Sequence, residues 1–116
     1  MKNLQFWEDK YTKSFQKFMH HRGMYIFFKM NIDHEKNQRL KKIYGHGMNK
    51  EYTGYKIHKR REMWLKRRLS YLTNMAKHRK EMLRVVTTKL SFFEKKIYHL
   101  GGNIINNWRD YLIKDL

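Results

Sequence analysis

The fold is decided by residues 57–100, which read IHKRREMWLKRRLSYLTNMAKHRKEMLRVVTTKLSFFEKKIYHL. Apolar residues recur in this stretch at steps that alternate between four and three, which keeps them on one face of an α-helix. The stretch contains no proline and no glycine, and only Arg79 breaks the apolar series. We therefore predict one long helix over about 57–100, roughly 65 Å in length. The series consists of Leu65, Leu69, Leu72, Ala76, Arg79, Leu83, Val86, Leu90, Phe93, Ile97 and Leu100.

The apolar face of this helix is wider than a two-stranded coiled coil requires. With Leu65 at heptad position d, the series fills positions a and d, and positions c and g add aromatic and methionine side chains. So broad a face needs cover on two sides. We expect the N-terminal helices to fold back on one side and a protein partner to cover the rest, with a monomeric helical bundle as the alternative. The predicted partner face comprises Trp64, Leu65, Leu69, Tyr71, Leu72, Met75, Met82, Leu83, Val86, Leu90, Phe93 and Ile97.

The N-terminal third predicts shorter helices. One helix is expected over residues 2–22, where apolar side chains recur at helical spacing up to Gly23. The apolar run from Met24 to Met30 favours a helix, with a short strand as the alternative. Asp33 could cap a further helix that ends at Tyr44. The face of the first helix consists of Leu4, Trp7, Tyr11, Phe15 and Phe18.

Glycines mark the ends of the long helix. Three of them fall within residues 45–56, which predicts a loop, because glycine loses much conformational freedom in regular structure. Gly101 and Gly102 are expected to end the long helix, and Asn103 to cap a short helix over 103–116. The prediction is an extended all-α protein in which residues 1–116 form a single helical unit.

The charge of the chain points to an anionic partner. Lys and Arg total 27 against 10 Asp and Glu, which gives a formal net charge of +17. A positive stripe along a helix is typical of nucleic-acid binding, because cations that neutralise phosphates release counterions. RNA is the favoured partner, with anionic lipid, acidic protein and DNA as alternatives. The candidate contact residues are Lys59, Arg60, Arg61, Lys66, Arg67, Arg68, Lys77, Lys80 and Arg84.

Aromatic side chains are interleaved with these cations. Trp64, for example, lies between Arg61 and Lys66 and could stack on an unpaired base. The interpretation favoured from the sequence is nevertheless packing against protein, because Trp64 and Tyr71 fall on the apolar side of the helix.

The sequence carries no recognisable catalytic or metal-binding motif. The chain has no cysteine, its seven histidines include no HExxH or HxxxH spacing, and no serine stands in a GxSxG setting. No phosphate-binding glycine loop is present. We therefore expect no enzymatic activity, cofactor or metal site.

A membrane-spanning helix is not expected either. The longest uncharged run, from Ile97 to Trp108, is twelve residues and contains glycine and asparagine, whereas a span needs about 20 apolar residues.

These features together suggest a structural subunit of a large assembly. The favoured hypothesis is a basic helical protein that contacts RNA, as in an organellar ribosome. The alternative is a peripheral accessory subunit of a mitochondrial respiratory or ATP synthase complex, in contact with anionic lipid and core subunits. The expected location is the mitochondrial matrix or the matrix face of the inner membrane, with cytoplasm and nucleus left open.

Overall fold

A computed structural model describes residues 2–44 and 52–114, with side chains described for 2–37 and 60–114. It contains two long helices, α1 (Leu4–Tyr44) and α2 (Tyr52–His99), and one turn of 3-10 helix, η1 (Trp108–Tyr111). The described residues include no strand. The all-α prediction is therefore confirmed.

The N-terminal residues form one continuous helix of 41 residues instead of the predicted series of shorter helices. Asn3 caps its start, because the Asn3 side chain accepts a hydrogen bond from the Phe6 amide at 3.0 Å. Gly23 does not interrupt α1. A helical glycine costs only about 1 kcal/mol, and Phe18 and Tyr25 are buried on either side of it. The strand alternative for Met24 to Met30 is wrong, since this segment is helical.

Helix α2 begins at Tyr52, so residues 52–56 of the predicted loop are helical. The remainder of that loop, 45–51, lies outside the described residues. The helix ends as predicted at the glycine pair. Gly101 has a φ of +84°, its amide donates to the Tyr98 carbonyl at 3.0 Å, and the Gly102 amide donates to the Ile97 carbonyl at 2.9 Å. This pattern is a Schellman motif, and its left-handed conformation at Gly101 favours glycine, which has no Cβ to clash.

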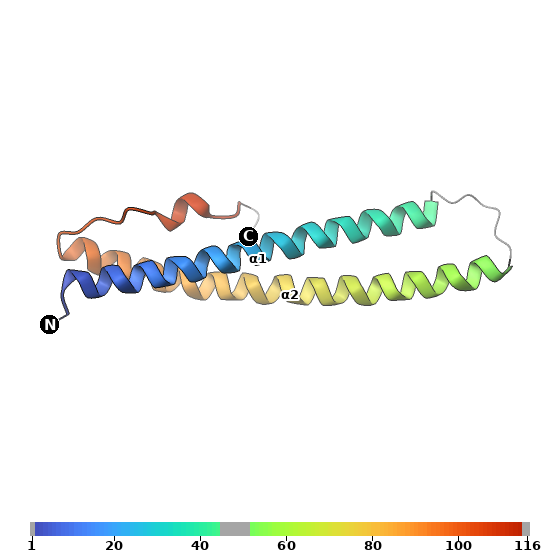
Figure 1. Ribbon diagram of the computed structural model, residues 1–116, viewed down its shortest axis with the longest axis horizontal. Helices are drawn as coiled ribbons and strands as arrows, with labels where there is room; N and C mark the ends of the chain where they lie inside the picture. Colours follow the sequence, from blue (N-terminus) through green and yellow to red (C-terminus); the bar gives the residue numbers. More distant parts are fainter. Residues whose placement is uncertain (1, 45–51, 115–116) are drawn as a thin grey trace. The chain divides into compact units, whose positions relative to one another are not determined.

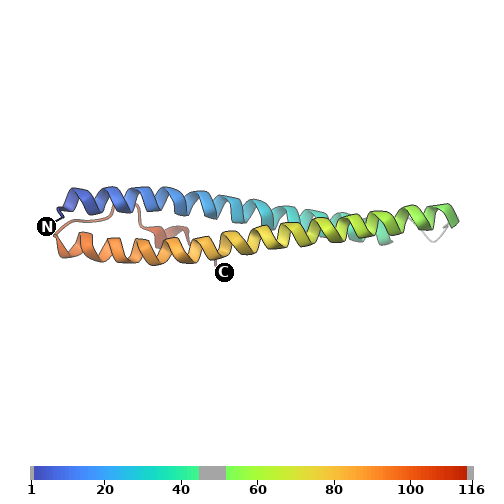
Figure 2. The same ribbon diagram turned by 90° about the horizontal axis from the view of Figure 1, so that it is seen from below.

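The chain divides into two compact units, and each unit contains a segment of both helices. Unit 1 comprises 4–24 of α1, 78–99 of α2 and the C-terminal segment 100–114. Unit 2 comprises 25–44 of α1 and 52–77 of α2. Within each unit the two helix segments lie side by side and run antiparallel (Figure 1, Figure 2).

The core of each unit is a seam of residues at alternating steps of three and four. In unit 1, Tyr11 and Phe18 of α1 are buried with Leu83, Val86, Leu90 and Ile97 of α2. In unit 2, the buried side chains are Tyr25, Phe28, Ile32, Leu65, Leu72 and Ala76. The predicted periodicity of α2 thus marks the residues that pack on α1.

The polar break in the seam has a polar partner. Arg79 of α2 donates a hydrogen bond from Nη1 to Nδ1 of His21 on α1, at 2.9 Å. The Nε atom of Arg79 is buried without a hydrogen-bond partner among the described residues. Burial and the nearby Arg79 charge lower the pKa of His21, with smaller contributions from His20, His78 and Lys17. A neutral ring is the form that can accept this hydrogen bond.

The C-terminal segment forms only the η1 turn, so the helix predicted over 103–116 is wrong for 103–107 and 112–114. Side chains of α1 hold its backbone instead. The Tyr11 hydroxyl donates to the Asn106 carbonyl at 2.5 Å and accepts from the Trp108 amide at 3.3 Å, and Arg22 Nε donates to the Tyr111 carbonyl at 2.7 Å. These backbone groups are therefore engaged by α1 rather than by a helix of their own.

Candidate nucleic-acid interface

The densest group of exposed cations lies in unit 2, on α2. Residues 60–77 contain six Lys or Arg and one acidic residue, Glu62. All six cations are exposed, because they occupy positions outside the seam. They are Arg60, Arg61, Lys66, Arg67, Arg68 and Lys77, which we call the basic cluster. The side chain of Lys59, also predicted here, lies outside the described residues.

Ion pairing leaves most of this charge available. Arg68 approaches Glu35 of α1 at 3.8 Å, and its side chain stays 43% exposed. Among the described residues the structure shows no ion pair for Arg60, Arg61 or Arg67. These guanidinium groups can therefore meet phosphate oxygens, to which they bind in bidentate geometry.

Two large aromatic side chains lie within the basic cluster. Trp64 is 57% exposed and Tyr71 is 55% exposed. The packing against protein favoured from the sequence is thus not seen within the described residues of unit 2. Both residues stand at position c of the heptad, beside the seam and not in it, whereas Leu65 and Leu72 at position d are buried.

Most other residues of the predicted partner face pack within the chain itself and are not available to a partner. Leu65, Leu72, Leu83, Val86, Leu90 and Ile97 are buried by packing within their own units. Leu69, Met75, Met82 and Phe93 are half-buried. Trp64 and Tyr71 are the members of the predicted face whose side chains are exposed.

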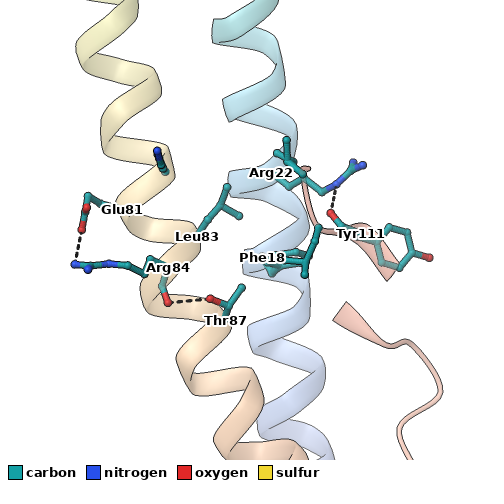
Figure 3. Close-up of a pocket in the computed structure, with 10 residues that line it drawn as sticks. Phe18, Arg22, Glu81, Leu83, Arg84, Thr87 and Tyr111 are labelled. Carbon is teal, nitrogen blue, oxygen red and sulfur yellow. Dashed lines mark hydrogen bonds and ion pairs between the residues drawn. The ribbon is translucent and has the colours of Figure 1, made fainter. Parts of the chain in front are cut away.

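The two other predicted anion contacts, Lys80 and Arg84, belong to unit 1. Both are exposed, and Arg84 forms an ion pair with Glu81 at 2.9 Å. They line a cavity of about 240 Å³ together with Arg22 and residues of the C-terminal segment. Figure 3 shows Leu83 of α2 and Phe18 of α1 facing one another in this cavity. The structure therefore assigns Lys80 and Arg84 to a different unit from the basic cluster.

Sequence reasoning missed the polar cluster that anchors the C-terminal segment. Glu94 is only 7% exposed, although it is a charged residue outside the apolar series of α2. Its carboxylate accepts two hydrogen bonds from Arg109 Nη1, at 2.6 and 2.7 Å, and one from Trp108 Nε1 at 3.3 Å. These hydrogen bonds fasten the C-terminal segment to α2 within unit 1. The sequence did not reveal this cluster, because the short helix predicted over 103–116 does not form and the η1 turn brings Arg109 to Glu94 instead.

The described residues contain no group of three or more His, Cys, Asp or Glu side chains arranged to hold a metal ion. None of their helical stretches is long and apolar enough to cross a membrane.

Comparisons of the chain with models of protein families, with curated proteins and with solved structures find no match.

Proposed function

We propose that this chain is a non-enzymatic structural subunit of a large assembly, and that the basic cluster of unit 2 contacts RNA, as in an organellar ribosome. The observation that carries the proposal is the exposure of all six cations of residues 60–77 on a chain of net charge +17. Such a surface gains free energy when it meets phosphates, because condensed counterions are released.

The residue types favour phosphate over a general acidic partner. Four of the six cations are arginines, whose planar guanidinium groups match phosphate oxygens in pairs. The four arginines form two pairs that lie seven residues, or about two turns, apart on one helix, and this repeated charge suits a polyanion rather than a single carboxylate.

A second candidate function rests on exposed apolar side chains in unit 1. Val85, Phe92 and Ile105 are exposed, and Ile105 reaches 98%. Apolar side chains of this size close to cations suit a protein subunit or an anionic lipid surface, as in a peripheral accessory subunit of a mitochondrial membrane complex.

The RNA proposal is tested by neutralising the basic cluster. The variant carries Arg60→Gln, Arg61→Gln, Arg67→Gln and Arg68→Gln. Binding of the full chain to a labelled RNA of about 16 nucleotides is followed by fluorescence anisotropy over a series of salt concentrations. We expect weaker binding, and a plot of log K against log salt that is shallower by about 3, because four phosphate contacts are lost.

The matched control removes the same charge from exposed positions of unit 1, by Lys13→Gln, Lys89→Gln, Lys95→Gln and Lys114→Gln. Circular dichroism verifies that both variants are folded. Equal losses of affinity in the two variants would mean that binding follows net charge, and the basic cluster would then not be the RNA contact.

A further inference from the structure

The aromatic side chains of unit 2 stand in a fixed relation to its arginines. Residues three and four apart on a helix are surface neighbours. The four neighbours of Trp64 at these spacings are Arg60, Arg61, Arg67 and Arg68. Trp64 is therefore surrounded by guanidinium groups on both sides along the helix.

Tyr71 shares two of these neighbours. Arg67 and Arg68 precede it by four and three residues, so they lie between the two aromatic side chains along α2. Trp64 and Tyr71 are separated by seven residues, about 10.5 Å along the helix axis, and they face nearly the same direction. The order along this surface is arginine pair, ring, arginine pair, ring.

Neither ring packs against another aromatic or cationic side chain among the described residues. Both side chains are more than half exposed, and among the described residues neither makes a ring contact, cation–π contact or hydrogen bond. Aromatic surface exposed to water gains free energy when a partner covers it. The surroundings are strongly cationic, so a neutral apolar partner would have to desolvate arginines. An occupant that is both planar and negatively charged meets both requirements.

We infer that Trp64 and Tyr71 stack on unpaired bases, so that unit 2 binds single-stranded RNA in preference to duplex RNA. This inference rests on the proposed function and specifies its ligand. In a duplex the base faces are already stacked on one another, and only a single strand can offer them to a protein. The axial rise of about 10.5 Å between Trp64 and Tyr71 is about three times the spacing of about 3.4 Å between neighbouring stacked bases of a strand. The rings therefore take two separate bases, and Arg67 and Arg68 meet the intervening phosphates.

The test uses the full chain and three labelled probes of equal length: single-stranded oligouridylate, its abasic counterpart with the same phosphates, and duplex RNA. We expect the wild-type chain to bind oligouridylate at least tenfold more tightly than either of the others, because each stacked base contributes about tenfold. Trp64→Leu and Tyr71→Leu together should lower affinity for oligouridylate by about 100-fold. The salt dependence should stay unchanged, since no phosphate contact is removed.

Two controls separate stacking from folding. Trp64→Phe with Tyr71→Phe retains the rings and should restore most of the affinity. Phe27→Leu removes an aromatic side chain of unit 2 that is 55% exposed, as Tyr71 is, but lies on α1. This control should bind like the wild type.

The outcomes distinguish the two proposals. Equal binding of the abasic and uridylate strands would overturn base stacking and leave the RNA proposal standing. No binding to any of the three RNAs would overturn both. Binding to vesicles of anionic phospholipid that exceeds binding to RNA, and that is lost with the two leucine substitutions, would assign this surface to a membrane instead.

Discussion

At the scale of single residues, the pair of His21 and Arg79 is the feature with the clearest energetic signature. Its geometry requires a neutral imidazole, because Nδ1 accepts the hydrogen bond from Arg79. A proton on that nitrogen would place two positive groups 2.9 Å apart in a partly buried position. Burial and the Arg79 charge accordingly lower the pKa of His21 in the folded protein.

This lowered pKa makes stability depend on pH in a defined direction. Between the ordinary histidine pKa of about 6.5 and the lower value in the folded state, the unfolded chain binds a proton that the folded chain excludes. The stability contributed by the neutral His21 is therefore complete above pH about 6.5, and the free energy of unfolding should fall as the pH drops from there through the lower pKa of the folded state. Denaturant titrations at a series of pH values measure this change.

His21→Gln supplies the control, since its amide oxygen can still accept from Arg79 but does not titrate. The difference between the two pH profiles isolates His21 from the other six histidines. If the wild type and the variant lose stability in parallel on acidification, another group is responsible.

At the scale of helices and segments, two glycines differ in the space around them. Gly23 lies within α1, and a Cβ atom added to it would meet nothing within 4 Å. Gly102 follows α2, and a Cβ there would lie 2.6 Å from Leu4 Cδ1 and 3.0 Å from Ile97 Cγ2. The first position has room for a side chain and the second does not.

Alanine substitutions should separate these roles. Gly23→Ala should raise the free energy of unfolding by about 1 kcal/mol, through helix propensity. Gly102→Ala should lower it by about 1–3 kcal/mol, because Leu4 and Ile97 must shift. Denaturant melts of both variants beside the wild type give the comparison. A gain at Gly102 or a loss at Gly23 would contradict this account of α1 and the C-terminal segment.

The success of the sequence predictions follows the strength of local signals. The heptad series of α2 is regular over five repeats, so it identified the helix, its core side and its glycine stop. The continuity of α1 was missed, because Gly23 was given more weight than the packing on either side of it. The C-terminal turn was also missed, since Tyr11 and Arg22 hold its backbone from about 90 residues away in sequence.

The candidate site was partly predictable for the same reason. The basic cluster can be recognised in the sequence as a concentration of Lys and Arg, and all six of its members are exposed. The exposure of Trp64 and Tyr71 was not predictable, because it depends on which side of α2 faces α1. The packing of Leu65 and Leu72 in the structure shows that position d is buried while position c, with Trp64 and Tyr71, is exposed.

At the scale of the whole molecule, unbalanced charge is the dominant feature. Carboxylates are few, and among the described residues Glu35, Glu81 and Glu94 already serve ion pairs with Arg68, Arg84 and Arg109. The remaining cations repel one another, which opposes a compact state.

Screening should therefore stabilise the isolated chain. Raising sodium chloride from about 10 mM to about 1 M shortens the Debye length from about 30 to 3 Å, and the Tm should rise by about 5 °C. Chloride is preferable to sulfate, because sulfate also strengthens apolar burial. A Tm that falls with added chloride would show that attractive pairs outweigh the repulsion.

The polar pair within the seam also restricts how the helices can align. A seam that repeats every seven residues would pack nearly as well after one helix slides by a full repeat. A shift of seven residues in one direction would place Leu72 opposite His21, and a shift in the other direction would place Val86 there. In both cases the ring nitrogen of His21 would lose its donor, Arg79. Leaving a partly buried ring nitrogen without its hydrogen-bond partner destabilises the folded state by up to about 1–3 kcal/mol. The pair thus specifies the register of the two helix segments in unit 1, because this alignment is more stable than alignments shifted by seven residues.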